Sequence, residues 1–455
     1  MTPVVPVAEA AAVESPRPVL TRLYLLRLSW PIILANAAVP LLGLADTAVI
    51  GNVGTLAELG AIAFGAVIFS FVYWSFGFLR MGTTGFTAQA AGARDEAEVR
   101  ATLWRALGVA FALGGALIAL QLPIGRLALF LLDGSDEVEA LTRGYFHVRI
   151  WGAPAALGMF VLMGTLIGLG RGKLLLVVQL FLNGLNILLD VWFAGVLGWG
   201  AEGVALGTAL AEWTALVLAA GLVFRLLRAR HRDAEPFLPL ARLKALGPLR
   251  RALRANFDIM LRTLLLVASF AWFVRQSGQF GDDVLAAHHI LLQFIAFSAF
   301  FLDGYAYVVE ALIGESVGAG DRRRFDVAVR LSTELAAVTA AVLALMILVF
   351  GNVAAGLLTV HEPVLAAADR ALPMAAIYVA LAFAAFQLDG IFIGATRTRE
   401  MRNASFVSVA VFLAASAVLI PWAGSQGLWL AFIAYVCARA LALGCYYPAL
   451  RRSIA

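Results

Sequence analysis

The sequence predicts an all-α integral membrane protein in which twelve transmembrane helices form two pseudo-symmetric six-helix lobes. Three observations lead to this fold class. The chain of 455 residues is 62% hydrophobic and only 14% charged, whereas soluble domains are about 25% charged. Apolar windows of about 20 residues, the length that crosses the hydrocarbon core of a bilayer, recur along almost the whole chain. The second half also repeats the first at a constant spacing of 226 residues.

Each predicted helix is one of these apolar windows, taken in chain order. The four windows that begin at residues 59, 139, 284 and 364 are longer than the bilayer requires, so these helices are expected to tilt or to project beyond it. The windows and their turns leave no room for a soluble catalytic domain. The predicted spans are 24–50, 59–91, 99–122, 139–170, 173–197, 202–227, 253–279, 284–317, 326–350, 364–395, 403–423 and 427–449.

The spans divide the chain into four segments. The first segment contains four prolines and two glutamates that interrupt its apolar run, so we expect a disordered tail and no signal peptide. The predicted segments are a cytoplasmic tail at 1–21, an N-lobe at 22–227, a cytoplasmic linker at 228–252 and a C-lobe at 253–455.

The positions of Lys and Arg predict the orientation of the chain. Nine basic residues lie at 225–254, in the stretch between the sixth and seventh spans and at the adjoining span ends, and others follow the fourth, eighth, tenth and twelfth spans. The alternate turns at 51–58, 195–203 and 423–427 contain none. The positive-inside rule therefore places both termini and the linker in the cytoplasm, with the chain in the inner (cytoplasmic) membrane. The basic residues are spread over every inner turn, which argues against a nucleic-acid-binding patch.

The internal repeat predicts how the lobes are related. Six spans per half is an even number, so both halves enter the membrane from the same side. Such a parallel repeat has its axis along the membrane normal and encloses a central cavity between the lobes. Residues that match at the spacing of 226 include Gly92 with Gly318, Asp95 with Asp321, Leu131 with Leu357, Val138 with Val364 and Arg171 with Arg397.

Two aspartates, Asp46 and Asp190, lie inside membrane-length apolar segments. A carboxylate at this depth costs at least about 2.5 kcal/mol on insertion scales, so such residues usually serve ions, protons or substrates. The repeat does not preserve them, because their C-lobe counterparts are Trp272 and Ser416. This one-sidedness favours a cation or proton site inside the N-lobe. The alternative is a structural pair of carboxylates that other side chains satisfy.

The helix period places further polar residues beside Asp190. Asn186 precedes it by four residues and shares its face, and Asn183 lies one turn further back. Thr208 supplies a hydroxyl on the following helix. The first span contains two hinge candidates, Pro31 and Pro40, because each proline removes a backbone hydrogen bond. The alternative is that these prolines are tolerated without consequence, as membrane helices often allow.

Three acids within the C-lobe spans, Asp303, Glu310 and Asp389, are further candidates for the cavity. Asp303 and Glu310 are seven residues apart on one helical face, and we expect Glu310 and Asp389 to line the cavity and attract cations. We also expect Asp258 to pair with Arg262 four residues later. The remaining residues of interest are His288 and His289, expected at a solvated membrane interface, Arg149, expected to anchor its helix, and Arg80, expected either to reach toward the surface or to pair with a cavity acid.

Enzyme motifs are absent from the sequence. The chain has no His-Glu-x-x-His, no Gly-x-Ser-x-Gly and no Gly-x4-Gly-Lys-Ser/Thr. We therefore expect no bound metal and no cofactor, and a transporter whose energy comes from an ion gradient. The acidic spans favour amphiphilic substrates that are neutral or cationic. The main alternative is a flippase for lipid or polysaccharide precursors.

The run P-x8-P-L-L-G-L-A-D-T-A-V-I-G, from Pro31 to Gly51, resembles the first helix of the MATE (multidrug and toxic compound extrusion) transporters, specifically of their DinF-type branch. Similar blocks recur in the expected order at 80–93, 183–192, 256–266, 302–311 and 388–403, so the resemblance covers almost the whole chain. It implies two six-helix lobes in a V-shaped arrangement and export of drug-like small molecules by a monomer, driven by H⁺ or Na⁺.

The resemblance also implies roles for individual residues. An acid on the first helix and an Asn-x3-Asp pair on the fifth are implicated in cation coupling in the DinF-type branch, and they match Asp46, Asn186 and Asp190. Thr208 matches the hydroxyl of the sixth helix, and Pro31 matches the proline at which the first helix is thought to bend. Another branch uses a glutamate in its seventh helix, which this chain lacks. That difference favours H⁺ over Na⁺ as the coupling ion.

Overall fold

The structure, a computed structural model, describes residues 18–132, 134–231 and 233–454. The side chains of residues 39–48, 52 and 53 lie outside what it describes. Within the described ranges the chain is helical and contains no strand. The first nine α-helices belong to the N-lobe: α1 (Arg22–Val53), α2 (Leu56–Ser75), α3 (Phe78–Gly92), α4 (Glu96–Ala119), α5 (Gln121–Leu132), α6 (Asp136–Arg149), α7 (Ala153–Gly168), α8 (Gly172–Asp190) and α9 (Gly200–Arg230).

The linker and the C-lobe complete the molecule. They contain α10 (Leu240–Leu243), α11 (Leu246–Gly278), α12 (Asp282–Gly318), α13 (Arg322–Leu358), α14 (Glu362–Gly394) and α15 (Thr398–Arg452). Ten helical stretches among the described residues are long and apolar enough to cross a membrane. Each of the twelve predicted spans falls on a helical segment, because α1 covers the first and α15 contains the last two.

Two local features differ from the prediction, and one confirms it. The span predicted at 59–91 is two helices, α2 and α3, with a short break between them. The last two predicted spans lie in α15 as two helices that meet at a non-helical kink at Gly424, whose φ of 57° favours glycine. A short helix that was not expected, α5, follows the third span.

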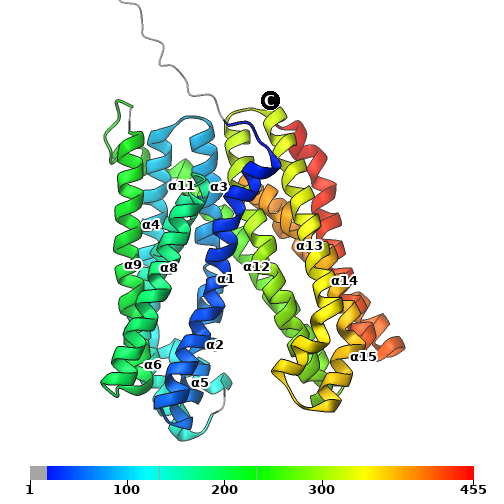
Figure 1. The fold of residues 1–455 in the computed structure, drawn as a ribbon. Helices are drawn as coiled ribbons and strands as arrows, with labels where there is room; N and C mark the ends of the chain where they lie inside the picture. The colour runs from blue at the N-terminus through cyan, green and yellow to red at the C-terminus, as the bar shows by residue number, and fades with distance from the viewer. Residues whose placement is uncertain (1–17, 133, 232, 455) are drawn as a thin grey trace, which may run out of the picture.

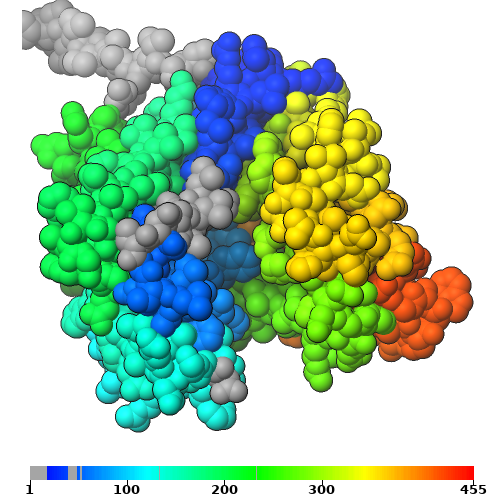
Figure 2. Space-filling model, turned by 60° about the horizontal axis from the view of Figure 1, so that its bottom comes forward, coloured from blue at the N-terminus to red at the C-terminus, as the bar shows by residue number. Residues whose placement is uncertain are grey.

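The two lobes meet at one end and diverge at the other. Figure 1 shows the C-terminus and the start of α1 at the end where the lobes meet. Viewed from the opposite end, the surface is hollowed between α2 of the N-lobe and α12 of the C-lobe (Figure 2). One buried apolar cluster fills the N-lobe, a second fills the C-lobe, and a third joins α1, α7 and α8 to α12–α15.

Small residues hold the lobes together where they meet. A Cβ on Gly92 of α3 would overlap the carbonyl oxygen of Glu315 on α12, and a Cβ on Gly318 of α12 would overlap the carbonyl oxygen of Gln89 on α3. Gly92 and Gly318 are equivalent in the repeat, so the contact is itself pseudo-symmetric. The Gln89 side chain also donates to the carbonyl oxygen of Gly394 at 2.9 Å.

Ion pairs fasten the linker to the N-lobe. Arg100 on α4 binds Asp233 through two bonds of 2.8 Å, and this hydrogen-bonded guanidinium lowers the pKa of the Asp233 carboxyl to about 2. Arg242 on α10 binds Asp95 at 2.6 Å. Since these partners precede or begin α4, the linker lies against the N-lobe.

Candidate functional site

A buried polar cluster lies on the face of α8 that packs against α9. Asn186 and Asp190 have no exposed surface, and Thr208 is 3% exposed. The Asn186 amide donates to the Thr208 hydroxyl at 3.1 Å, and that hydroxyl donates to the carbonyl oxygen of Val204 at 2.9 Å. The amide oxygen of Asn186 has no hydrogen-bond partner among the described residues. The predicted i, i+4 face and its threonine partner are therefore present as one cluster.

Close approach of α9 positions the Asp190 carboxylate. A Cβ on Gly207 would lie 2.5 Å from Oδ1 of Asp190, so only glycine leaves room for the carboxylate at this point. The six-residue π-helix Val191–Val196 begins directly after Asp190. Such π segments often occur at functional sites, because they change the direction of side chains within a helix.

The same face of α8 continues toward α1. Asn183 donates to the carbonyl oxygen of Ala38 on α1 at 2.9 Å and accepts from Gln179 at 3.0 Å. The cluster is thereby connected to the backbone of the helix that contains Asp46. The side chains of Asp46 and Pro40 lie outside the described residues, so their contacts with this cluster stay a prediction.

The region around Pro31 lies between the two lobes. A Cβ on Gly172 of α8 would lie 3.0 Å from the Ile32 side chain, and a Cβ on Gly304 of α12 would overlap the Ile33 side chain. The backbone is helical through both prolines, from Arg22 to Val53. A change in bend near Pro31 would therefore act on the N-lobe and the C-lobe at once.

Two acids of the C-lobe that were expected to line the cavity and attract cations are paired with buried arginines. Glu310 on α12 binds Arg80 on α3, with Oε2 and Nη1 3.0 Å apart. Asp389 on α14 binds both Arg262 on α11 and Arg439 on α15. All five residues are at most 6% exposed. A free mid-membrane carboxylate attracts cations, but a carboxylate neutralised by guanidinium groups does not.

Asp303 differs from the other two acids. It is half-buried and has no partner within ion-pair distance among the described residues. Together with Glu310 and Asp389, Asp303 makes three acids in this region. The region also contains three arginines, Arg80, Arg262 and Arg439. The region is therefore balanced in charge rather than mainly acidic.

Two expectations about ion-pair partners can now be compared with the contacts. The pair of Asp258 with Arg262 was wrong, because Asp258 binds Arg402 at 2.8 Å while Arg262 binds Asp389. Arg149 anchors its helix as expected, through an ion pair with Glu212 at 3.2 Å.

The interfacial position expected for His288 was also wrong. His288 is 2% exposed, accepts from the Trp429 indole at 3.0 Å and lies 2.8 Å from the Ser277 hydroxyl. His289, the next residue, is exposed as expected.

The sequence did not identify the glycines that allow the helices around these sites to approach each other closely. Gly207, Gly172 and Gly304 let helices approach, and no local pattern separates them from the other 39 glycines of the chain. It also left open the partner of Arg80, which lies 230 residues away in the other lobe.

Comparison with known proteins gives a consistent result. The MatE family model matches residues 31–192 and 259–419. DNA damage-inducible protein F of Escherichia coli (strain K12) is 37% identical over 416 residues, which is 91% of this chain and 90% of that protein. A probable multidrug resistance protein NorM of Pasteurella multocida is 26% identical, with 90% of each chain covered.

Solved structures share the fold. A multidrug resistance MATE family transporter of the MOP superfamily, solved in an outward-facing conformation, superposes with a TM-score of 0.82 at 18% identity. The superposition covers 95% of this chain and 97% of that one.

Proposed function

The chain belongs to the MatE family of membrane transporters, and on this premise we propose that it is a proton-coupled antiporter exporting amphiphilic, neutral or cationic organic compounds. The family membership makes it a transporter rather than an enzyme. The coupling ion, the substrates and the residues that serve them are the parts that we propose.

The observation that carries the proposal is the buried cluster of Asn186, Asp190 and Thr208 beside α1. Burial in a medium of low dielectric favours the neutral form of a carboxyl group, so proton binding at this place is favourable once the site is closed to water. Asp46 and Asp190 are expected to titrate as a coupled set, so the proton belongs to the pair rather than to either residue.

Movement of α1 connects the proton to the substrate. Protonation from outside removes charge beside α8, and α1 can then bend near Pro31. Because the residues after Pro31 pack against Gly304 of the C-lobe, the bend narrows the space between the lobes and releases the substrate. Loss of the proton toward the cytoplasm reverses these steps.

The balanced charges around Asp303, Glu310 and Asp389 argue against the flippase alternative. A site for a pyrophosphate head group needs cations that are free to bind phosphate. Arg80, Arg262 and Arg439 instead bind carboxylates of the chain itself. The neutral region leaves the N-lobe acids to set the preference for cationic or neutral substrates.

Proteoliposomes containing the full chain test this function. We expect export of an amphiphilic cationic dye under an imposed pH gradient without sodium. Asp46→Asn and Asp190→Asn should each abolish export while the protein still inserts, because both keep size and remove titration. Asp326→Asn, at a partly exposed ion pair with Arg451, is the matched control and should export normally. Normal export by both Asp46→Asn and Asp190→Asn would refute the proposed coupling site. Export that requires sodium and does not respond to pH would refute the proton as the coupling ion.

Four further features belong to the same proposal. We infer inner-membrane insertion with both termini and the linker in the cytoplasm, because basic residues gather on those turns. We also infer a monomer. The lobes that move are those predicted from the sequence, 22–227 and 253–455, joined by the linker at 228–252. Under this orientation the molecule is open to the outside.

A further inference from the structure

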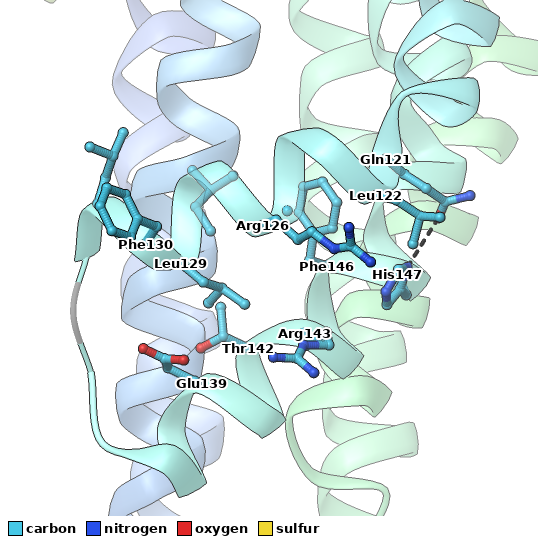
Figure 3. Close-up of a pocket in the computed structure, with 13 residues that line it drawn as sticks. Gln121, Leu122, Arg126, Leu129, Phe130, Glu139, Thr142, Arg143, Phe146 and His147 are labelled. Carbon is cyan, nitrogen blue, oxygen red and sulfur yellow. Dashed lines mark hydrogen bonds between the residues drawn. The ribbon is translucent and has the colours of Figure 1, made fainter.

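A cavity of about 950 Å³ lies in the N-lobe at the end opposite the termini. Its wall comes from α2, α5 and α6 (Figure 3). Leu129, Phe146 and Ile68 line it with apolar surface, and two arginines, Arg126 on α5 and Arg143 on α6, contribute to the same wall. None of the residues that line the cavity belongs to α8 or α9, which contribute the polar cluster described above.

The two arginines have no counter-ion among the residues that the structure describes. Neither Arg126 nor Arg143 makes a hydrogen bond or ion pair with any residue that the structure describes. In Figure 3 their guanidinium groups lie on the same side of the cavity as His147, whereas the one lining acid, Glu139, lies on the other side. His147 is itself engaged by the Gln121 amide at 3.1 Å.

The internal repeat shows what these two positions do in the other lobe. The residues 226 positions further on are Asn352 and Asp369. The Asn352 amide donates to the Asp369 carboxylate at 2.7 Å, so the equivalent side chains touch and satisfy each other. Where the C-lobe has this hydrogen-bonded pair, the N-lobe has two cations beside a cavity. Two guanidinium groups at such a site repel each other unless an anion from outside lies between them.

The surroundings of α5 indicate what kind of anion binds to these two arginines. The helix has 12 residues, too few to cross a bilayer. Leu122, Leu127, Phe130 and Leu131 are 57–81% exposed, and a short helix with outward apolar side chains lies in the membrane interface. Phospholipid phosphates occupy this level of the bilayer, directly above the acyl chains.

We propose that the cavity between α2, α5 and α6 binds a phospholipid of the leaflet at this end, with its phosphate on Arg126 and Arg143. Bidentate guanidinium groups match phosphate oxygens in geometry and charge. The glycerol and the first acyl carbons contact Leu122 and Phe130, and the acyl chains continue along the outside of the lobe.

Native mass spectrometry of the delipidated full chain tests the site. Phosphatidylglycerol and phosphatidylethanolamine should remain bound, whereas diacylglycerol, which lacks the phosphate, should not. Arg126→Gln combined with Arg143→Gln should lower phospholipid retention at least about tenfold. Arg370→Gln, an exposed arginine of the C-lobe next to Asp369, is the matched control and should retain lipid as the unchanged protein does.

A second measurement keeps the proposal testable if the double variant folds poorly. A photoreactive phenylalanine at Leu122 should cross-link to phospholipid while both arginines are present. Equal retention of diacylglycerol, unchanged retention by the double variant, or absence of the cross-link would each overturn the proposal. Displacement of the lipid by an equal concentration of glycerol phosphate would show a site for small anions instead.

Discussion

The ion pair between Arg80 and Glu310 joins the lobes at the end where they meet, and Glu310→Gln tests what it contributes. The two side chains are 7% and 2% exposed, and the guanidinium group also lies 3.9 Å from the centre of the Tyr307 ring. Removing one partner of a buried ion pair costs about 3–5 kcal/mol, because the other charge is left buried without compensation.

The cost applies only to the form in which these side chains are buried. When the lobes part at this end, water reaches Arg80 and the penalty disappears. Since every 1.4 kcal/mol is a factor of ten, Glu310→Gln should shift the equilibrium toward the form opened at this end by roughly 10² to 5 × 10³. The variant should therefore favour the opening that exposes the cavity to the cytoplasm.

Distances between spin labels report this shift. Labels at Lys173 and Arg323 lie on different lobes at the end of the molecule that carries the termini, and both positions are exposed. The native thiols of Cys437 and Cys445 are first replaced by serine. Double electron–electron resonance should then show a longer distance in Glu310→Gln than in the unchanged protein.

A second ion pair provides the control. Arg149 and Glu212 form a comparably buried pair with atoms 3.2 Å apart, but both belong to the N-lobe. Glu212→Gln should lower stability without changing the distance between the lobes. An unchanged distance in Glu310→Gln, or the same change in Glu212→Gln, would refute the role of Arg80 and Glu310 as an inter-lobe contact.

Three other predictions concern single contacts. Gly207→Ala places a methyl group 2.5 Å from the Asp190 carboxylate, so it should reduce proton-driven export at least about tenfold in proteoliposomes while insertion is normal. Trp429→Phe removes the donor to the buried His288 ring, and it should lower the free energy of unfolding by about 1–3 kcal/mol in a denaturation experiment. The pKa of Asp233 is lowered, so its ion pair stabilises the linker fully above the ordinary pKa near 3.9. This stabilisation is lost as the pH falls through about 2. A spin label on the linker should therefore become more mobile over that pH range.

Each of these predictions has an outcome that contradicts it. Gly221→Ala, at a helical glycine with open space around it, should export normally; an equal loss there would show a general effect of alanine rather than displacement of the carboxylate. Unchanged stability of Trp429→Phe would mean that the histidine finds another donor. A label at Leu238 that is equally mobile at pH 2 and pH 7 would mean that Asp233 does not hold the linker.

The spans could be predicted because the bilayer imposes a minimum length on apolar segments, and that length is visible in one sequence. The same rule explains the failure at α5, because a 12-residue helix containing Pro123 and Arg126 does not meet the required length. The turn predicted at 423–427 is confirmed, since two helices meet there at a non-helical kink at Gly424.

The candidate site could be predicted in part, and the division follows from the range of the contacts. Asn186 and Asp190 share a face because four residues make about one helical turn, so the period alone brings them together. The partners of Glu310 and Asp389 come from other helices, and in the first case from the other lobe. The spacing of residues in the sequence carries no information on contacts between distant helices. For this reason a local partner was expected for Arg262, and a role in attracting cations was expected for Glu310 and Asp389.

The attachment of the linker to the N-lobe limits how far the lobes can travel. A free chain of 25 residues could reach tens of ångströms, since extended chain spans about 3.3–3.6 Å per residue. With Asp233 and Arg242 fastened to α4 and its preceding turn, the freely extensible part shrinks to Lys244 and Ala245, between α10 and α11. Two residues reach only about 7 Å. The linker thus acts as a short tether. It permits the two lobes to rock about the end where they meet, and it prevents them from separating.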